Sequence, residues 1–268
     1  MSNLVLTPRL RLRDFTPARV SLPMTGQSIA TSEVLSFRLA HAQARDAVHA
    51  RLHLPSLAQR LHTELPILAE ASIPVLQLRT NAPDRAVYLR QPILGRTLHP
   101  DSVAQLQPTS TDLAVIIADG LSALAVERNA IPLLLNLLPK LFAAGWTIAP
   151  ITLVEQGRVA IGDPIGFHLR ARLSLVLIGE RPGLSSPDSL GAYITWHPHP
   201  DRTDADRNCL SNIRAGGLSP ESASERLLWY LQAARTRQIT GTSLKEGSIE
   251  LKAAATFTET RSKQNREL

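Results

Sequence analysis

Continuous apolar runs alternate with amphipathic stretches from about residue 73 to residue 239. We expect strands at six of these runs: IPVLQLR (73–79), RAVYLRQ (85–91), LAVIIA (113–118), WTIAPITLV (146–154), LSLVLIGE (173–180) and GAYITW (191–196). Helices are expected over 124–145, with Gly145 as a stop, after GRVAIGDPIG (157–166), and over 219–239. Apolar strands that alternate with helices are typical of a buried parallel sheet. The pattern therefore predicts an α/β fold with a mostly parallel sheet.

The first 72 residues follow a different pattern. Residues 1–30 contain Pro8, Pro17, Pro23 and Gly26 and are expected to be irregular. A helix is predicted over 32–52, capped by Thr31 or Ser32, and a second near LPSLAQRLHTEL (54–65). We therefore expect a helical N-terminal segment (1–72), a sheet domain (73–244) and a polar C-terminal tail (245–268).

Composition excludes several classes of protein. The chain has 268 residues, 44% of them hydrophobic, which suits one large domain or two small ones. No apolar run approaches the roughly 20 residues of a membrane span, and the N-terminus lacks the pattern of a secretory signal. Cys209 is the single cysteine, which excludes a disulfide framework and makes a reducing cytoplasm the expected location.

The net charge of +6 comes mostly from arginine, since only four of the 29 basic residues are lysine. A basic chain can bind nucleic acid, but the footprint of such binding is a cluster of basic residues. Here the arginines are scattered and only 4% of residues are aromatic, so we expect no nucleic-acid partner. Arginine-rich codon usage, or ion pairs with another subunit, accounts for the composition equally well.

Polar segments follow three of the predicted strands. They are Asp119-Gly120-Leu121-Ser122, Arg158-Val159 and Glu180-Arg181-Pro182-Gly183. Ligands of open α/β sheets bind outside the carboxyl ends of the strands, so the three segments are expected to form one rim. Glu180 is then either an acceptor facing a ligand or half of an ion pair at a strand end. Asp119 or Ser122 is either a helix N-cap or part of a ligand turn.

Other candidate groups lack partners for chemistry in the sequence. His197 and His199 alternate with proline in the predicted loop HPHPDRTDADRNC (197–209), which should hold the rings on one side, but no third zinc ligand has suitable spacing. Cys209 has no paired histidine nearby, so a small buried apolar role is the simpler interpretation. No G-x-S-x-G is present, which argues against acyl transfer. The sequence favours a binding subunit over a self-sufficient enzyme.

Five segments in order identify a family resemblance: TPARV, HAQARDAVHARL, VIIADGLSALAV, LIGERPGLSSPDSLGAYIT and RTDADRNCLSNIRAGGL. From about Leu10 to Lys245 the chain resembles the small (light) subunit of ethanolamine ammonia-lyase, an adenosylcobalamin-dependent enzyme. The resemblance implies a helical N-terminal segment, a Rossmann-like domain, and a hetero-oligomer with a large TIM-barrel subunit that binds ethanolamine. The corrinoid lies between the subunits, and homolysis of its cobalt–carbon bond leads to acetaldehyde and ammonia.

The resemblance also implies site residues. The family's cobalamin contacts fall on the valine of GRV, the glutamate of GERPG and the cysteine of RNCLSNI, which are Val159, Glu180 and Cys209 here. No Asp-x-His-x-x-Gly motif occurs, which agrees with base-on binding without a protein ligand to cobalt.

One departure from the family stands at Pro23-Met24, where a Gly-Arg pair is expected. Relatives linked with bacterial microcompartments carry a longer N-terminal extension, so both a microcompartment and the plain cytoplasm remain open. A stand-alone nucleotide-binding module and a purely structural partner are the alternative functions.

Overall fold

The computed structural model describes residues 12–16 and 18–245. Pro8 and Pro17, and the predicted tail beyond Lys245, lie outside the described residues. The described chain forms an α/β fold around a six-stranded sheet, together with a two-stranded ribbon near the N-terminus. The strands of the main sheet are β3 (Val75–Arg79), β4 (Leu113–Ala118), β5 (Ile151–Glu155), β6 (Leu173–Gly179), β7 (Leu190–Trp196) and β8 (Arg207–Ile213).

The sheet is mixed but mostly parallel, which confirms that part of the prediction. Its order is β3-β5-β4-β6-β7-β8, and β3, β5, β4 and β6 run parallel to one another. β7 runs antiparallel to β6, and β8 antiparallel to β7. The connection from β6 to β7 (180–189) contains no helix, and a parallel crossover needs a dozen or more residues. The apolar pattern of β7 therefore predicts that the strand is buried, but it does not predict whether the strand runs parallel or antiparallel to β6.

The main helices of this region are α4 (Arg85–Arg90), α5 (Pro100–Val103), α6 (Ala123–Ala143), α7 (Gly162–Leu169) and α8 (Pro220–Arg237). Short 3₁₀ turns lie at η2 (Pro92–Arg96), η3 (Val159–Ile161), η4 (Asp204–Asp206) and η5 (Gly241–Ser243). The predictions of α6 and α8 are confirmed, and Gly145 follows α6 with φ +69°. The predicted short helix is present as α7, but it begins at Gly162, within GRVAIGDPIG and not after it.

Three sequence predictions in this region are wrong in whole or in part. RAVYLRQ is the helix α4, because the Asp84 carboxylate accepts a hydrogen bond from the Val87 N–H at 2.8 Å and caps the helix. The end of the predicted loop 197–209 belongs to β8, which places Cys209 in an edge strand. The predicted strand over 146–154 begins only at Ile151, directly after Pro150, which cannot donate to a strand ladder.

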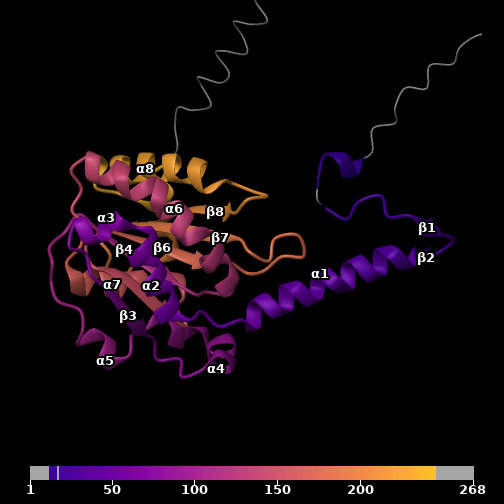
Figure 1. The fold of residues 1–268 in the computed structure, drawn as a ribbon, viewed down its shortest axis with the longest axis horizontal. Coiled ribbons are helices and arrows are strands. Elements are labelled where there is room, and N and C mark those ends of the chain that lie inside the picture. The colour runs from indigo at the N-terminus through magenta and orange to yellow at the C-terminus, as the bar shows by residue number, and fades with distance from the viewer. Residues whose placement is uncertain (1–11, 17, 246–268) are drawn as a thin grey trace, which may run out of the picture.

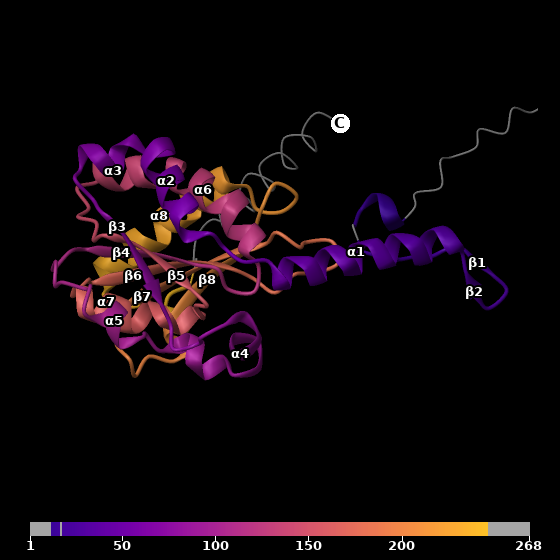
Figure 2. The same ribbon diagram turned by 60° about the horizontal axis from the view of Figure 1, so that its bottom comes forward.

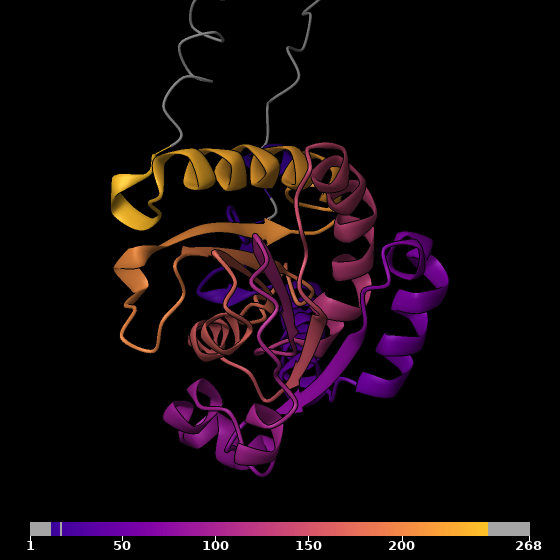
Figure 3. The same ribbon diagram turned by 90° about the vertical axis from the view of Figure 1, so that its left-hand side faces the viewer.

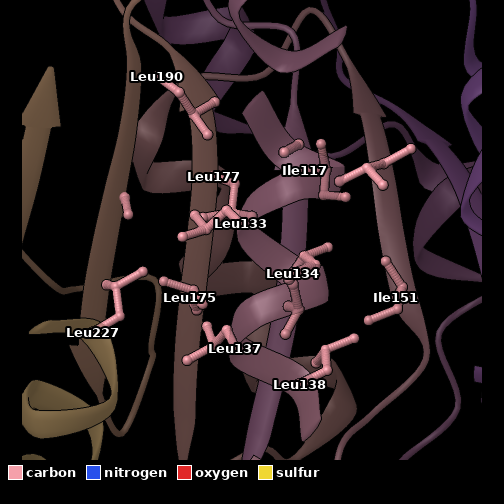
Figure 4. Close-up of a cluster of buried hydrophobic side chains, with 14 of the residues drawn as sticks. Ile117, Leu133, Leu134, Leu137, Leu138, Ile151, Leu175, Leu177, Leu190 and Leu227 are labelled. Carbon is pink, nitrogen blue, oxygen red and sulfur yellow. The ribbon is translucent and has the colours of Figure 1, made fainter. Parts of the chain in front are cut away.

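The central strands β4 and β6 are buried on both faces, and alternate residues of β4 point to opposite sides. Leu113, Val115 and Ile117 belong to a core cluster shared with α2, α6 and α8, while Ala114 and Ile116 pack in a cluster with α7. Figure 3 shows α6 and α8 on one side of the sheet and α7 on the other. In the larger cluster, leucines of α6 point at residues of β4, β5, β6 and β7 (Figure 4).

The N-terminal part contains η1 (Leu12–Asp14), β1 (Met24–Thr25), β2 (Ser28–Ile29), α1 (Thr31–His49), α2 (Leu54–Glu64) and α3 (Pro66–Glu70). The two predicted helices are present as α1 and α2. The predicted cap at Thr31 or Ser32 is wrong, since Ala30 is the N-cap and makes no side-chain cap hydrogen bond. α1 projects away from the sheet, with β1 and β2 at its far end (Figures 1 and 2).

Candidate functional site

The predicted rim is present at the carboxyl ends of β4, β5 and β6. Gly120 and Leu121 follow β4, Arg158 and Val159 follow β5, and Glu180 follows β6. All five line one hollow of about 410 Å³, together with Tyr88, Tyr193 and others. We call it the glutamate hollow. The rule for parallel sheets therefore placed these three segments correctly.

A second hollow of about 300 Å³ adjoins the first. It is lined by Arg96, Arg158, Val159, Ala160, Tyr193, Asp204, Arg207 and Cys209, and we call it the cysteine hollow. Arg158, Val159 and Tyr193 line both hollows. The structure thus places Val159 between the hollow that contains Glu180 and the hollow that contains Cys209.

Glu180 is held by one of its two carboxylate oxygens. Its Oε2 accepts hydrogen bonds from the Ser189 hydroxyl at 2.5 Å and from the Asn212 N–H at 3.1 Å. Its Oε1 accepts none from any residue that the structure describes. Gly191 lies close to this side chain, and a Cβ there would sit 3.1 Å from Oε1. The carboxylate is therefore fixed in place with one oxygen available to a ligand, and it makes no ion pair with Arg181 within the described chain.

Asp119 supports the rim from inside the protein. It is 1% exposed, and its Oδ1 accepts a hydrogen bond from the Gly157 N–H at 3.1 Å. The Arg85 Nη1 lies 3.5 Å from Oδ2 and donates to the Gly120 carbonyl at 2.7 Å. Burial raises the pKa of Asp119 to about 6, although Arg85 and the backbone donors oppose the rise. Asp119 thus ties the turns after β4 and β5 to α4.

Ser122 is the N-cap of α6, which agrees with the prediction of a helix N-cap at Asp119 or Ser122 and not with that of a ligand turn. Its hydroxyl oxygen accepts a hydrogen bond from the Ala125 N–H at 3.2 Å and donates to the Pro187 carbonyl at 2.7 Å. It is fully buried, so it holds the rim together and does not face a ligand.

Tyr88 forms one wall of the glutamate hollow, and sequence reasoning missed it because α4 was predicted as a strand. Its hydroxyl donates to the Gly157 carbonyl at 2.9 Å. The Arg158 guanidinium lies 4.2 Å from the centre of its ring, and the Arg158 Nη2 donates to the Tyr88 carbonyl at 3.1 Å. Burial raises the pKa of Tyr88, so its hydroxyl stays protonated.

Cys209 is exposed, which contradicts the prediction of a buried apolar role. It faces Tyr193 across the β7–β8 ladder. Desolvation of the thiol raises the pKa of Cys209; a hydrogen bond with Tyr193 opposes the rise, and the Glu180 carboxylate adds to it. No histidine lines its hollow, and the raised pKa favours the thiol over the reactive thiolate. A nucleophilic role is not supported.

Arg207, also missed at the sequence level, anchors the floor of the cysteine hollow. Its two terminal nitrogens each donate to a carboxylate oxygen of Asp163 at 2.6 Å, and Nη1 also donates to Thr195 at 3.1 Å. Both charged side chains are almost fully buried. Arg207 and Asp163 are 44 positions apart in the chain, so no local sequence pattern predicts their contact. It becomes visible only in the folded structure.

The histidine loop does not form a metal site. His197 has φ +47°, so the predicted extended loop with both rings on one side is wrong at this position. His199 Nδ1 lies 3.2 Å from Asp201, and its ring packs edge-on against Phe167 at 4.9 Å. Within the described ranges, no three His, Cys, Asp or Glu side chains are grouped so that they could hold a metal ion. The same residues contain no helix that is both long and apolar enough to span a membrane.

Comparison with known proteins agrees with the sequence resemblance. The family described as "Ethanolamine ammonia-lyase light chain" matches residues 7–245. The ethanolamine ammonia-lyase small subunit of Pseudomonas paraeruginosa is 49% identical over 245 residues, covering 89% of this chain and 87% of its own length. The protein of the same name from Pseudomonas putida is also 49% identical and is covered over 88% of its length; that from Pseudomonas aeruginosa is 48% identical and covered over 87%. A match over nearly the whole described chain, at this identity, places the protein in the family of ethanolamine ammonia-lyase small subunits.

Proposed function

We propose that this chain is the small subunit of an ethanolamine ammonia-lyase and that it binds adenosylcobalamin at the rim of its sheet. One observation carries the proposal. Val159 lines both hollows, Glu180 lines the first and Cys209 lines the second, so the three positions implied by the family resemblance surround one continuous site.

The polar groups at the rim fit a corrinoid. Such a ligand carries amide side chains around its ring and a nucleotide tail with a ribose and a phosphate. Glu180 Oε1, which has no donor among the described residues, can accept a hydrogen bond from an amide or a ribose hydroxyl. The N–H groups of Val159 and Ala160 have no acceptor within the described chain and can donate to an amide carbonyl. Leu121 and Ile178 supply apolar surface beside them.

The dimensions of the site favour a partner. Hollows of about 410 and 300 Å³ hold part of a corrinoid, which is larger than either. The remainder then needs a second protein surface, which is the role of the large subunit in this proposal. We propose a hetero-oligomer of large and small subunits in which this chain is inactive alone.

Adenosylcobalamin supplies radical chemistry when bound, and the deamination of ethanolamine to acetaldehyde and ammonia takes place on the large subunit. The residues of this chain bind and orient the cofactor. Glu180 fixes an edge through Oε1, Val159 contacts it between the two hollows, and Cys209 offers a neutral thiol. No residue of this chain would need to ligate cobalt if the cofactor bound base-on, as the family resemblance implies.

The proposal includes the organisation of the chain. Residues 73–244 form a Rossmann-like cofactor domain, preceded by a helical segment (1–72) and followed by a polar tail (245–268). We propose that the assembly lies in the cytoplasm, free or within a bacterial microcompartment, and that it binds neither nucleic acid nor membrane.

The test is to co-express this chain with its large subunit and to assay conversion of ethanolamine with adenosylcobalamin present. Each chain alone is the control. Activity only with both chains is the expected result. Full activity of the large subunit alone would overturn the proposal and leave this chain a structural partner.

A further inference from the structure

The cysteine hollow carries more positive than negative charge. Three arginines line it, namely Arg96, Arg158 and Arg207. The charge of Arg207 is balanced by Asp163 through two contacts of 2.6 Å. Asp204, the acidic residue of the hollow, lies 3.5 Å from Arg207, and its side chain is 81% exposed. Neither Arg96 nor Arg158 has an acidic partner within the described residues.

Arg158 is held rigidly but is only partly used. Its Nη2 donates to the Tyr88 carbonyl, and its guanidinium stacks on the Tyr88 ring at 4.2 Å. Its Nε is enclosed by protein and has no hydrogen-bond partner. Nη1 has no acceptor in the described chain either. The enclosed Nε is out of reach of a ligand, so Nη1 is the donor through which this positioned arginine can bind an acceptor from outside.

Arg96 is fixed beside Arg158 by the backbone. The Arg158 N–H donates to the Gly95 carbonyl at 2.8 Å. A Cβ at Gly95 would lie 2.8 Å from the Gln156 carbonyl oxygen and 2.9 Å from Arg158 Cγ, so the two segments are in tight contact. The Arg96 side chain makes no hydrogen bond or ion pair with any described residue and is exposed at the hollow.

We propose that the cysteine hollow is an anion subsite in which Arg96 and Arg158 bind the phosphodiester of the corrinoid's nucleotide tail. A phosphodiester presents two charged oxygens to planar guanidinium donors, which suits paired arginines better than a neutral amide does. Val159 and Ala160 line the same hollow, and their N–H groups, which have no acceptor within the described residues, could supply further donors. This inference rests on the proposed function and goes beyond it by assigning the tail of the ligand to one hollow.

The test uses the assembled complex and two corrinoids, one with the nucleotide tail (adenosylcobalamin) and one without it (adenosylcobinamide). Affinity is measured by equilibrium dialysis with detection of corrinoid absorbance, without substrate. Arg96→Gln is the main variant because its side chain contacts no polar partner in the described chain. We expect it to weaken adenosylcobalamin binding about tenfold and to leave adenosylcobinamide binding unchanged. Inorganic phosphate should compete with adenosylcobalamin in the wild type and compete less in the variant.

Two further variants keep the result interpretable. Arg158→Lys retains the charge but loses the planar fork, and we expect a loss confined to adenosylcobalamin. Arg170→Gln is the control and removes the same charge as Arg96→Gln. Arg170 is exposed and lies at the C-terminal end of α7, whereas Val159 and Ala160 of the hollow precede the N-terminal end of that helix. Both affinities should therefore stay unchanged.

The outcomes separate this inference from the function on which it rests. Equal loss of both corrinoids in Arg96→Gln, or no loss of either, overturns the anion subsite alone. Failure of the wild-type complex to bind either corrinoid overturns the proposed function and this inference together. Competition by phosphate that is equal in the wild type and Arg96→Gln places phosphate elsewhere and also overturns the subsite.

Discussion

At the scale of single residues, Glu180 explains why opposite charges follow so apolar a strand. Oε2 binds Ser189 and Asn212, which joins the end of β6 to the start of β7 and to β8. The adjacent arginine is not its partner in the described chain, so the pair is not a simple ion-pair cap. One oxygen is structural, and the other has no donor among the described residues.

Glu180→Ala should weaken adenosylcobalamin binding by the assembled complex at least tenfold, because a charged hydrogen bond contributes about 1.5–3 kcal/mol. Equilibrium dialysis measures the change. Glu155→Ala is the matched control, since Glu155 ends the neighbouring strand β5 and lines neither hollow. Equal affinities for wild type and Glu180→Ala would remove Glu180 from the site.

Asp119 gives a prediction about pH. Its folded pKa of about 6 lies above the ordinary value of 3.8, so the folded protein binds the proton more tightly than the unfolded chain. The site's contribution to stability is therefore fully present below 3.8 and is lost as pH rises through 6. Asp119→Asn removes this dependence. The wild type should gain about 2 kcal/mol of unfolding free energy, relative to the variant, between pH 7 and pH 4.5.

Urea unfolding of both proteins at the two pH values measures that difference, and Asp206→Asn is the control. Hydrogen bonds from the Thr203 N–H and hydroxyl lower the pKa of Asp206 below 3.8. The stabilising contribution of the Asp206 carboxylate is therefore present above pH 3.8 and is lost as the pH falls through this lowered pKa. The difference between wild type and Asp206→Asn should stay constant from pH 7 to 4.5. A constant difference for Asp119→Asn as well would contradict the raised pKa.

Elements at the rim meet through glycines. A Cβ at Gly179 would overlap the Ser122 carbonyl oxygen and lie 2.6 Å from the Asp119 carbonyl oxygen. Both obstacles are backbone atoms and cannot swing away. The turn after β4 therefore touches the end of β6 directly, which brings Leu121 and Glu180 into the same hollow.

Gly179→Ala should lower the free energy of unfolding by about 3 kcal/mol or more, because the added methyl group forces the backbones apart. Denaturant unfolding measures the loss. Gly145→Ala is the control, since a Cβ there meets nothing within 4 Å and only the φ of +69° is unfavourable. It should cost about 1–2 kcal/mol. Equal losses in the two variants would mean that the close contact at Gly179 has no special cost.

Individual helices and strands differ in how well the sequence predicts them. Continuous apolar runs revealed β4 and β6, because strands buried on both faces leave no polar alternation to misread. RAVYLRQ misled, since its apolar residues suit a strand while the deciding signal, the Asp84 cap, precedes them. The start of β8 was predicted as a loop because this edge strand mixes buried and exposed residues and has no continuous apolar run. The strand-end rule placed Val159 and Glu180 at the rim, and the family resemblance added Cys209. Tyr88, Arg96 and Arg207 line the hollows only through tertiary contacts.

At the scale of the whole molecule, the described chain divides its apolar residues between a closed core and an open helix. Helices cover both faces of the sheet, whereas α1 projects away from it (Figure 1). Several large apolar side chains of α1 are exposed. Leu35 and Leu39 are 59% and 61% exposed and lie one turn apart on the same face of α1. Exposed apolar residues grouped in this way mark an interaction surface, and the proposed function supplies a large subunit to cover it.

The double variant Leu35→Gln/Leu39→Gln should therefore weaken assembly with the large subunit. Full burial of a leucine contributes about 1.5–3 kcal/mol, so a loss of affinity of at least tenfold is expected. Analytical ultracentrifugation of the mixed subunits measures it. Thermal unfolding of the isolated variant should match that of the wild type, because surface substitutions usually change stability by less than about 0.5 kcal/mol. Leu135→Gln is the control, with 45% exposure on α6 and a position 13 residues, about 20 Å, along the helix from the rim residue Ser122. Unchanged assembly of the double variant, or equal weakening by Leu135→Gln, would show that α1 is not the surface that the partner covers.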